Sequence, residues 1–193
     1  MTKIAIFASG SGTNAENIIR YFNNHPSIKV ALVVSNNPHA YVLTRVAHTD
    51  VPSIVLKKEA LLQPDMVLPI LSSYEIQWIV LAGFLLKIPS YLVNVFFNRI
   101  INIHPALLPK FGGKGMYGHF VHQAVIEAHA HESGITIHFV NDQYDEGNII
   151  FQASFAVLPS DQVDDVENKV HSLEQEYFPQ VIEQTILSSK QSS

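Results

Sequence analysis

Two polar residues with the spacing of a reactive pair close an apolar segment near the middle of the chain. They are Asn102 and His104, in the stretch "INIHPALLPKFGG". In an extended strand, residues i and i+2 project from the same face, about 7 Å apart along the strand. Pro105 favours an extended conformation for His104. An amide donor beside an imidazole suits a reaction through an oxyanion, with the amide stabilising the oxygen and the imidazole transferring a proton.

A later acidic loop offers a partner for this histidine. The stretch "IHFVNDQYDEGNII" contains Asp142, Asp145 and Glu146 before a glycine. In a catalytic interpretation, one of these carboxylates contacts His104, orients the ring and raises its pKa. His138 shares a strand face with Thr136 just before the loop, so both are candidate supporting residues. The alternatives stay open at this point: the acidic loop is only solvated, and the Asn–His pair is only structural.

A glycine-rich loop follows the first apolar segment. In "FASGSGTNA", Gly10, Gly12 and Ala15 fit the G-x-G-x-x-A pattern, and Thr13 and Asn14 add side-chain donors at the predicted helix start. Glycines allow the backbone to approach an anion, and a helix N-terminus supplies free N–H groups. The second strand ends in Ser-Asn-Asn, without the acid that a dinucleotide ribose needs. The loop therefore favours a single phosphate monoester over NAD, although a tight turn without ligand remains an alternative.

Composition and charge narrow the classes of partner. The chain of 193 residues has a net charge of −5 and no cysteine. This charge argues against nucleic acid as a partner, and the lack of cysteine excludes disulfides and thiolate metal sites. His119 and His122 are not spaced i, i+4 and have no paired carboxylate at ligand spacing, so we predict no metal. The apolar runs are too short for a signal peptide or a membrane span, and we predict a cytoplasmic protein.

Apolar segments rich in β-branched residues alternate with helical patterns. This order predicts an α/β fold: a single-domain, Rossmann-like, mostly parallel sheet with helices on both faces and an antiparallel C-terminal strand region. One helix is expected over 61–74. The segment "GITIHFV" alternates with period two, as a half-exposed strand does. We expect the domain to span residues 1–187 and residues 188–193 to form a disordered tail.

Taken together, these motifs identify a resemblance. "SGSGTN", "LAGF", "NIHPALLPKFGG", "GITIHFV", "DEG" and "VHSLEQEYFP" occur with the order and spacing of folate-dependent phosphoribosylglycinamide formyltransferases, within the formyltransferase-fold family. The resemblance covers nearly the whole chain. The element N-x-H-P-[SA]-L-L-P is specific to formyl-folate enzymes, and the glycine loop is typical of the branch that uses a ribonucleotide.

The resemblance implies transfer of a formyl group from 10-formyltetrahydrofolate, the co-substrate, to the amine of glycinamide ribonucleotide, with no metal required. It implies that Asn102 stabilises the oxyanion and that His104 is the acid–base group, with Asp145 as its partner. It also implies two binding sets: Gly12, Thr13, Asn14 and Glu174 for the ribonucleotide, and Leu85, Leu86, Lys87, Ile88, Asn102, Val140, Asn141 and Asp145 for the folate.

Three positions depart from the family pattern. Ala60 or its uncharged neighbours stand where related sequences often have an arginine. Phe120 stands where a histidine is common, and Gln175 follows Glu174 where a histidine is usual. These changes place individual ligand contacts in question, but they do not alter the Asn102, His104 and Asp145 set.

Other activities use the same residues. A formyltetrahydrofolate deformylase uses water as the nucleophile and normally has an N-terminal regulatory domain, which we do not expect here. A methionyl-tRNA formyltransferase needs a basic C-terminal RNA-binding extension, which we also do not expect. A non-catalytic module that binds a nucleotide phosphate is the alternative from another class. The expected partners are small-molecule substrates, and the expected assembly is a monomer or a homodimer.

Overall fold

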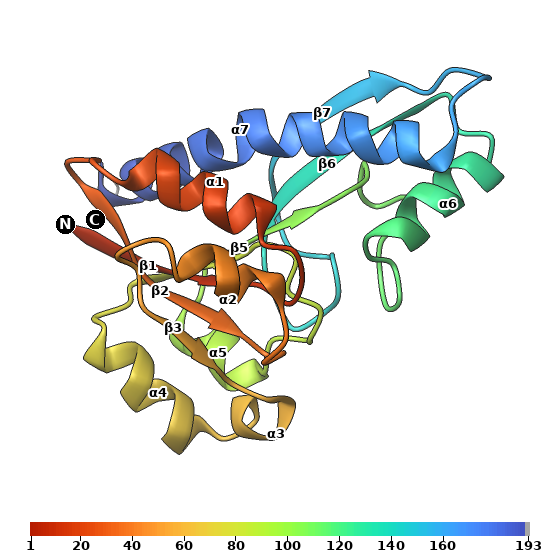
Figure 1. The fold of residues 1–193 in the computed structure, drawn as a ribbon. Helices are drawn as coiled ribbons and strands as arrows, with labels where there is room; N and C mark the ends of the chain where they lie inside the picture. The colour runs from red at the N-terminus through yellow and green to blue at the C-terminus, as the bar shows by residue number, and fades with distance from the viewer. Residues whose placement is uncertain (192–193) are drawn as a thin grey trace. The chain divides into compact units, whose positions relative to one another are not determined.

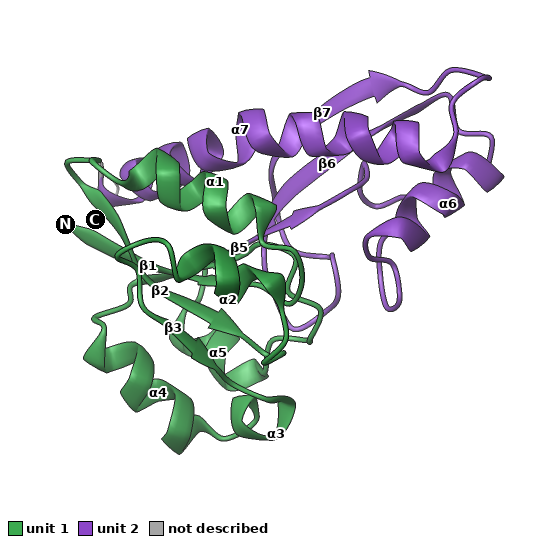
Figure 2. Ribbon diagram, in the orientation of Figure 1, with its two compact units in different colours: residues 1–101 green, residues 102–193 purple. Residues whose placement is uncertain are grey.

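The computed structural model describes residues 1–191, which form parts of two compact units with a boundary after Ile101 (Figure 2). The strand order of the seven-stranded sheet is β3-β2-β1-β4-β5-β6-β7. Strand β5 (Ile100–His104) contains the boundary between the units. The α/β fold class is thereby confirmed, whereas the expectation of one domain over residues 1–187 remains a prediction.

Unit 1 contains parallel strands separated by helices (Figure 1). Strand β1 (Thr2–Phe7) pairs with β2 (Ile28–Ser35) and β4 (Trp78–Leu81), and β2 pairs with β3 (Ser53–Val55), all in parallel. Every residue of β4 is buried, as is typical of a parallel strand covered on both faces. The helices are α1 (Thr13–Phe22), α2 (Tyr41–Val46), α3 (Lys58–Leu61), α4 (Pro64–Ser73) and α5 (Ser90–Val95).

The helix predicted over 61–74 is present as α4, but it begins at Pro64 and not at Leu61. Helix α3 ends at Leu61, and α4 begins at Pro64. Proline has no N–H and disfavours helical geometry in the residue before it. Gln63 is accordingly extended, with φ −106° and ψ 104°. Pro64 interrupts the helix and then occupies the first turn of the next one, where its missing N–H costs nothing.

The glycine loop is braced within unit 1. Gly12 has φ 78° and directly precedes α1. A Cβ atom at this position would lie 2.5 Å from Val42 Cβ in α2. Arg45, also in α2, donates from Nε to the Ser11 carbonyl oxygen over 2.9 Å and forms an ion pair with Glu16. The shape of the loop therefore depends on α2 as well as on its own glycines.

Unit 2 is built on the last residues of β5, on β6 (Glu132–Phe139) and on β7 (Ile149–Ala156). Strands β6 and β7 are antiparallel, as expected for the C-terminal region. Helix α7 (Val163–Gln191) packs on both strands, and α6 (His119–Glu127) packs against α7. The buried face of α7 includes Val166, Val170, Phe178 and Ile182.

The interpretation of β6 as half-exposed is wrong. Both faces of the strand are buried: Ile135 and Ile137 on one, and Thr136 and His138, exposed by 0% and 2%, on the other. The alternation of apolar and polar residues is real, but the polar side chains have hydrogen-bond partners inside the protein and need no water. Burial with period two belongs instead to the edge strand β7.

The expected disordered tail begins too early. Helix α7 continues through Gln191, so residues 188–191 are helical, and only residues 192–193 lie outside the described part of the chain. Hydroxyl groups near this end bond back to the helix: Thr185 donates to the Val181 carbonyl and Ser189 to the Ile186 carbonyl. None of the described helices is both long and apolar enough to span a membrane.

The contrast between two glycines yields a test of the loop. Gly12→Ala places a methyl group against Val42 at a positive φ, whereas a Cβ on Gly10 meets nothing within 4 Å. We expect Gly12→Ala to lower the free energy of unfolding by about 1–3 kcal/mol, and Gly10→Ala to change it by less than about 1 kcal/mol. Urea denaturation measures both. Equal losses in the two variants would contradict the proposed bracing by α2.

Buried His122 makes stability depend on pH. Burial lowers its pKa from 6.5 to about 4, although the charge of Glu167 raises it in part. Between pH 6.5 and 4 the unfolded chain therefore binds a proton that the folded chain does not. The free energy of unfolding therefore decreases as the pH is lowered through this window, by up to about 3 kcal/mol. We expect His122→Gln to flatten this part of the profile, as measured by denaturation from pH 4 to 8. A slope equal to that of the wild type would refute the assignment.

Candidate active site

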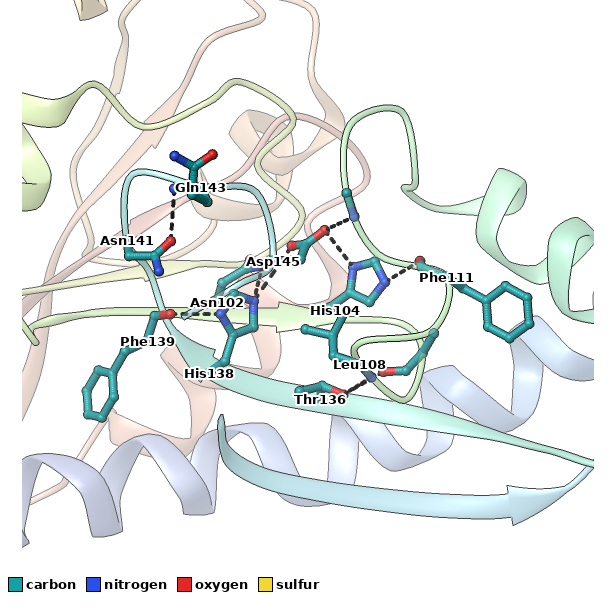
Figure 3. Close-up of polar contacts among 12 residues, drawn as sticks. Asn102, His104, Leu108, Phe111, Thr136, His138, Phe139, Asn141, Gln143 and Asp145 are labelled. Carbon is teal, nitrogen blue, oxygen red and sulfur yellow. Dashed lines mark hydrogen bonds and ion pairs between the residues drawn. The ribbon is translucent and has the colours of Figure 1, made fainter. Parts of the chain in front are cut away.

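Five of the residues singled out from the sequence lie together in unit 2 (Figure 3). They are Asn102 and His104 in β5, Thr136 and His138 in β6, and Asp145 in the loop that precedes β7. His104 and His138 are exposed by only 3% and 2%. The pairs of contacts described below connect all three segments into one polar cluster.

His104 has an acceptor at each ring nitrogen. Its Nε2 lies 2.8 Å from the Phe111 carbonyl oxygen, and its Nδ1 lies 3.6 Å from Asp145 Oδ2. Because a carbonyl oxygen only accepts, the proton of the neutral ring is on Nε2. Nδ1 is then the basic nitrogen, with a carboxylate beside it. A proton that arrives at Nδ1 produces an imidazolium with an acceptor on both sides.

Asp145 is held between backbone and histidines. The Gly113 N–H donates to Oδ2 over 2.9 Å, and Oδ1 lies 3.7 Å from His138 Nε2. Asp145 adopts φ 57°, a left-handed conformation that aspartate tolerates better than most residues. This turn of the backbone directs the carboxylate from the loop to the two rings, as Figure 3 shows.

His138 orients the amide of Asn102. Its Nδ1–H donates to the Phe139 carbonyl oxygen over 2.8 Å, so in the neutral ring Nε2 is an acceptor. Asn102 Nδ2 donates to this nitrogen over 3.1 Å. The amide therefore presents its NH2 group to His138 and keeps a second N–H for another acceptor. A register shift between Ile137 and His138 in the pairing with β7 accompanies this arrangement.

Thr136 fixes the turn that follows His104. Its hydroxyl donates to the Ala106 carbonyl oxygen over 2.7 Å and accepts from the Leu108 N–H over 2.9 Å. Gln152 Nε2 also donates to the same oxygen, over 2.9 Å. One buried hydroxyl thus satisfies backbone groups on both sides of the turn. Thr136 therefore positions the segment that follows His104.

The environment sets the protonation states. Burial lowers the pKa of His104 below 6.5, although Asp145 and the Phe111 carbonyl raise it in part. Burial raises the pKa of Asp145, but the contacts with His138, His104 and the Gly113 N–H together outweigh it and leave this pKa below 3.8. At neutral pH the site therefore contains a neutral imidazole and an ionised carboxylate. This is the state of a general base with a ready counter-ion.

Unit 1 contains a second set of candidate residues. The Ser9 hydroxyl donates to Asn36 Oδ1 over 2.5 Å and accepts from the Leu85 N–H over 2.8 Å. The glycine loop and the "LAGF" segment are thus joined at the carboxyl edge of β1, β2 and β4. Leu85 is half exposed, Lys87 is exposed and Ile88 is buried. Thr13 is exposed, whereas Gly12 and Asn14 are buried.

The remaining candidates lie in unit 2. Glu174 is a buried residue of α7, exposed by 7%. Val140 and Asn141 follow β6 and lead into the loop of Asp145, where Asn141 Oδ1 accepts from the Gln143 N–H over 2.9 Å. These positions are compatible with ligand contacts, and the roles assigned to them remain proposals.

The sequence did not reveal the backbone groups of the site. The Phe111 carbonyl and the Gly113 N–H come from the segment after the Asn–His pair. Gln152, in β7, donates to the Leu108 carbonyl as well as to Thr136. A backbone group has no residue-type signature. The tight packing of Gly112 in this segment, where a Cβ would lie 2.5 Å from a Leu108 side-chain atom, is likewise visible only in the structure.

The chain matches known proteins along nearly its whole length. Residues 2–182 match the family described as formyl transferase. Phosphoribosylglycinamide formyltransferase of Haemophilus influenzae is 36% identical over 94% of this chain and 86% of its own length. The chloroplastic enzyme of Arabidopsis thaliana is 37% identical over 93% of this chain, which spans 64% of that relative.

The same relationship holds for solved structures. The crystal structure of phosphoribosylglycinamide formyltransferase from Bacillus halodurans has a TM-score of 0.86 and 32% identity, covering 98% of this chain and 96% of that chain. Similarity in sequence and similarity in fold thus extend over nearly all of this chain. The chain therefore belongs to the formyl transferase family, among relatives that are phosphoribosylglycinamide formyltransferases.

Proposed function

We propose that this protein transfers the formyl group of 10-formyltetrahydrofolate to the amine of N1-(5-phospho-D-ribosyl)glycinamide, a step of purine biosynthesis. The observation that carries the proposal is the contact of a neutral, buried His104 with ionised Asp145, beside an oriented Asn102 amide. The full-length likeness to phosphoribosylglycinamide formyltransferases supports the identity of both substrates. The chemistry requires no metal.

The proposed reaction begins when the glycinamide amine attacks the formyl carbon. The new C–N bond converts the formyl oxygen to an oxyanion, to which the second N–H of Asn102 donates. His104 Nδ1 accepts the proton that the amine loses, and Asp145 stabilises the imidazolium. The intermediate then collapses: the bond from carbon to N10 of the folate breaks, and His104 returns the proton to that nitrogen.

Binding is assigned to the same residues that the sequence indicated. The free N–H groups at the start of α1, with Gly12, Thr13 and Asn14, bind the ribonucleotide phosphate. Glu174 accepts from a ribose hydroxyl. The segments 85–88 and 140–145 line the folate site with backbone edges and apolar side chains, which suit a flat pterin. The assembly state and a cytoplasmic location remain predictions, and the Arabidopsis relative is named as chloroplastic.

One assay distinguishes this function from its alternatives. The protein is mixed with 10-formyltetrahydrofolate, and folate absorbance is followed with and without the ribonucleotide. We expect turnover only when the ribonucleotide is present. Equal turnover in its absence would indicate a deformylase, and no turnover in either mixture would indicate a binding module.

His104→Ala removes the base but none of the groups assigned to the phosphate. We expect kcat to fall by about 10²–10⁴-fold. The dissociation constant for the ribonucleotide, measured by calorimetry, should change by less than about threefold, because no group assigned to the phosphate is removed. His131→Ala, at an exposed histidine of the same unit, serves as the matched control. A His104→Ala variant with the kcat of the wild type would end the catalytic assignment.

Asp145→Asn keeps an acceptor for the Gly113 N–H and removes the charge. Because the carboxylate raises the pKa of His104, its loss lowers this pKa further. We therefore expect the acid limb of the kcat profile to move to lower pH. The maximum rate should fall on the order of 10²-fold, because the imidazolium loses its counter-ion. A profile from pH 4.5 to 8 with the wild-type midpoint would exclude Asp145 from this role.

A further inference from the structure

A second cluster of titratable side chains lies away from the proposed reaction, where α6 packs against α7. His119 is the first residue of α6, and Asp164 and Glu167 lie in the first turns of α7. One ligand atom from each of the three side chains lies within 4.8 Å of the other two. His119 and Asp164 are exposed and Glu167 is partly buried, so solvent and ions reach the cluster.

The spacing of these residues places them on one face of each helix. Asp164, Glu167 and His171 are separated by three and four residues, so they share a face of α7, and His119 and His122 share a face of α6 in the same way. His171 Nε2 lies 3.9 Å from Glu167 Oε1. Two carboxylates and several imidazoles therefore line one seam of the helix pair.

The second observation is a buried ring nitrogen near the cluster that lacks a hydrogen-bond partner in the described part of the chain. His122 is exposed by 2%, and its Nδ1 has no hydrogen-bond partner among the residues that the structure describes. Glu167 and His119, two members of the cluster, are near enough to act electrostatically on this ring. A buried polar atom without a partner is rare in folded proteins, and this one belongs to the face of α6 that also carries His119.

We propose that His119, Asp164 and Glu167 bind a divalent transition-metal ion of the zinc class where α6 packs against α7. One imidazole and two carboxylates form a donor set that zinc accepts, at bond lengths of about 2.0–2.2 Å. The three ligand atoms must each move inward by about 1 Å to reach that geometry, and exposed side chains have the rotamer freedom to do so. The ion fastens the start of α6 to α7 and has no part in formyl transfer.

The proposal contrasts with the expectation of no metal from the sequence. His119 and His122 have no carboxylate near them along the chain, but α7 supplies two from a distance of more than forty positions. It also differs from the polar cluster of His104, His138 and Asp145, which contains a similar donor set. The experiment must therefore separate these two locations.

Calorimetric titration of the full chain with ZnCl2, after treatment with EDTA, tests the site. We expect one ion per chain with a dissociation constant in the micromolar range or below, and an increase of several degrees in Tm. His119→Gln and Glu167→Gln should each weaken binding at least tenfold and abolish the shift in Tm. The matched control His131→Gln should bind as the wild type does, and Mg²⁺ should give no comparable heat, because it prefers oxygen ligands.

Several outcomes overturn the proposal. They are no zinc binding by the wild type, wild-type affinity in His119→Gln, or binding that is lost in His104→Ala but retained in His119→Gln. Circular dichroism in EDTA establishes that each variant is folded. Formyl transfer measured in EDTA should be the same for His119→Gln and the wild type, so a failure of the metal site and a failure of the proposed function are distinguishable.

Discussion

The position of one carboxylate governs the proposed chemistry. Asp145 lies in a loop, and its two oxygens contact groups from three other places in unit 2: the Gly113 N–H, His104 and His138. A partly buried carboxylate is costly unless it is paired or hydrogen-bonded. The Gly113 N–H offsets part of that cost in the resting site, and a proton on His104 supplies the opposite charge during the proposed reaction. The loop is closed tightly, because a Cβ on Gly147 would lie 1.6 Å from the Phe139 carbonyl oxygen. A side chain there would displace the loop and, with it, the carboxylate.

The polar face of β6 is the second requirement. Thr136 and His138 are buried where an ordinary strand would place apolar residues, and each has hydrogen-bond partners in the backbone and in one side chain. Thr136 holds the turn after His104, and His138 orients Asn102. Buried polar networks specify geometry well only when each member has its partners. The strand therefore acts as a rigid support for the groups that we place at the reaction, and its neighbour β7 is left as the edge.

The glycine loop and the acid–base cluster are held in place by separate sets of contacts. The glycine loop takes its shape from contacts inside unit 1, with Val42 against Gly12 and Arg45 on the Ser11 carbonyl. The acid–base cluster takes its shape from contacts inside unit 2. Each part is therefore preorganised by its own neighbours, which limits the ordering that substrates must bring about.

The sequence by itself determined the fold class, the family resemblance and the Asn102–His104 pair, because strand periodicity and local motifs are properties of neighbouring residues. It also indicated Asp145, although only by resemblance, since three acids stood in that loop. The tertiary structure decided what depends on contacts between distant segments: the choice of Asp145, the backbone partners of His104 and the burial of the polar face of β6. Such contacts leave no periodic trace in the chain. The same reason explains why the histidine of α6 and the acids of α7 met only in the folded protein.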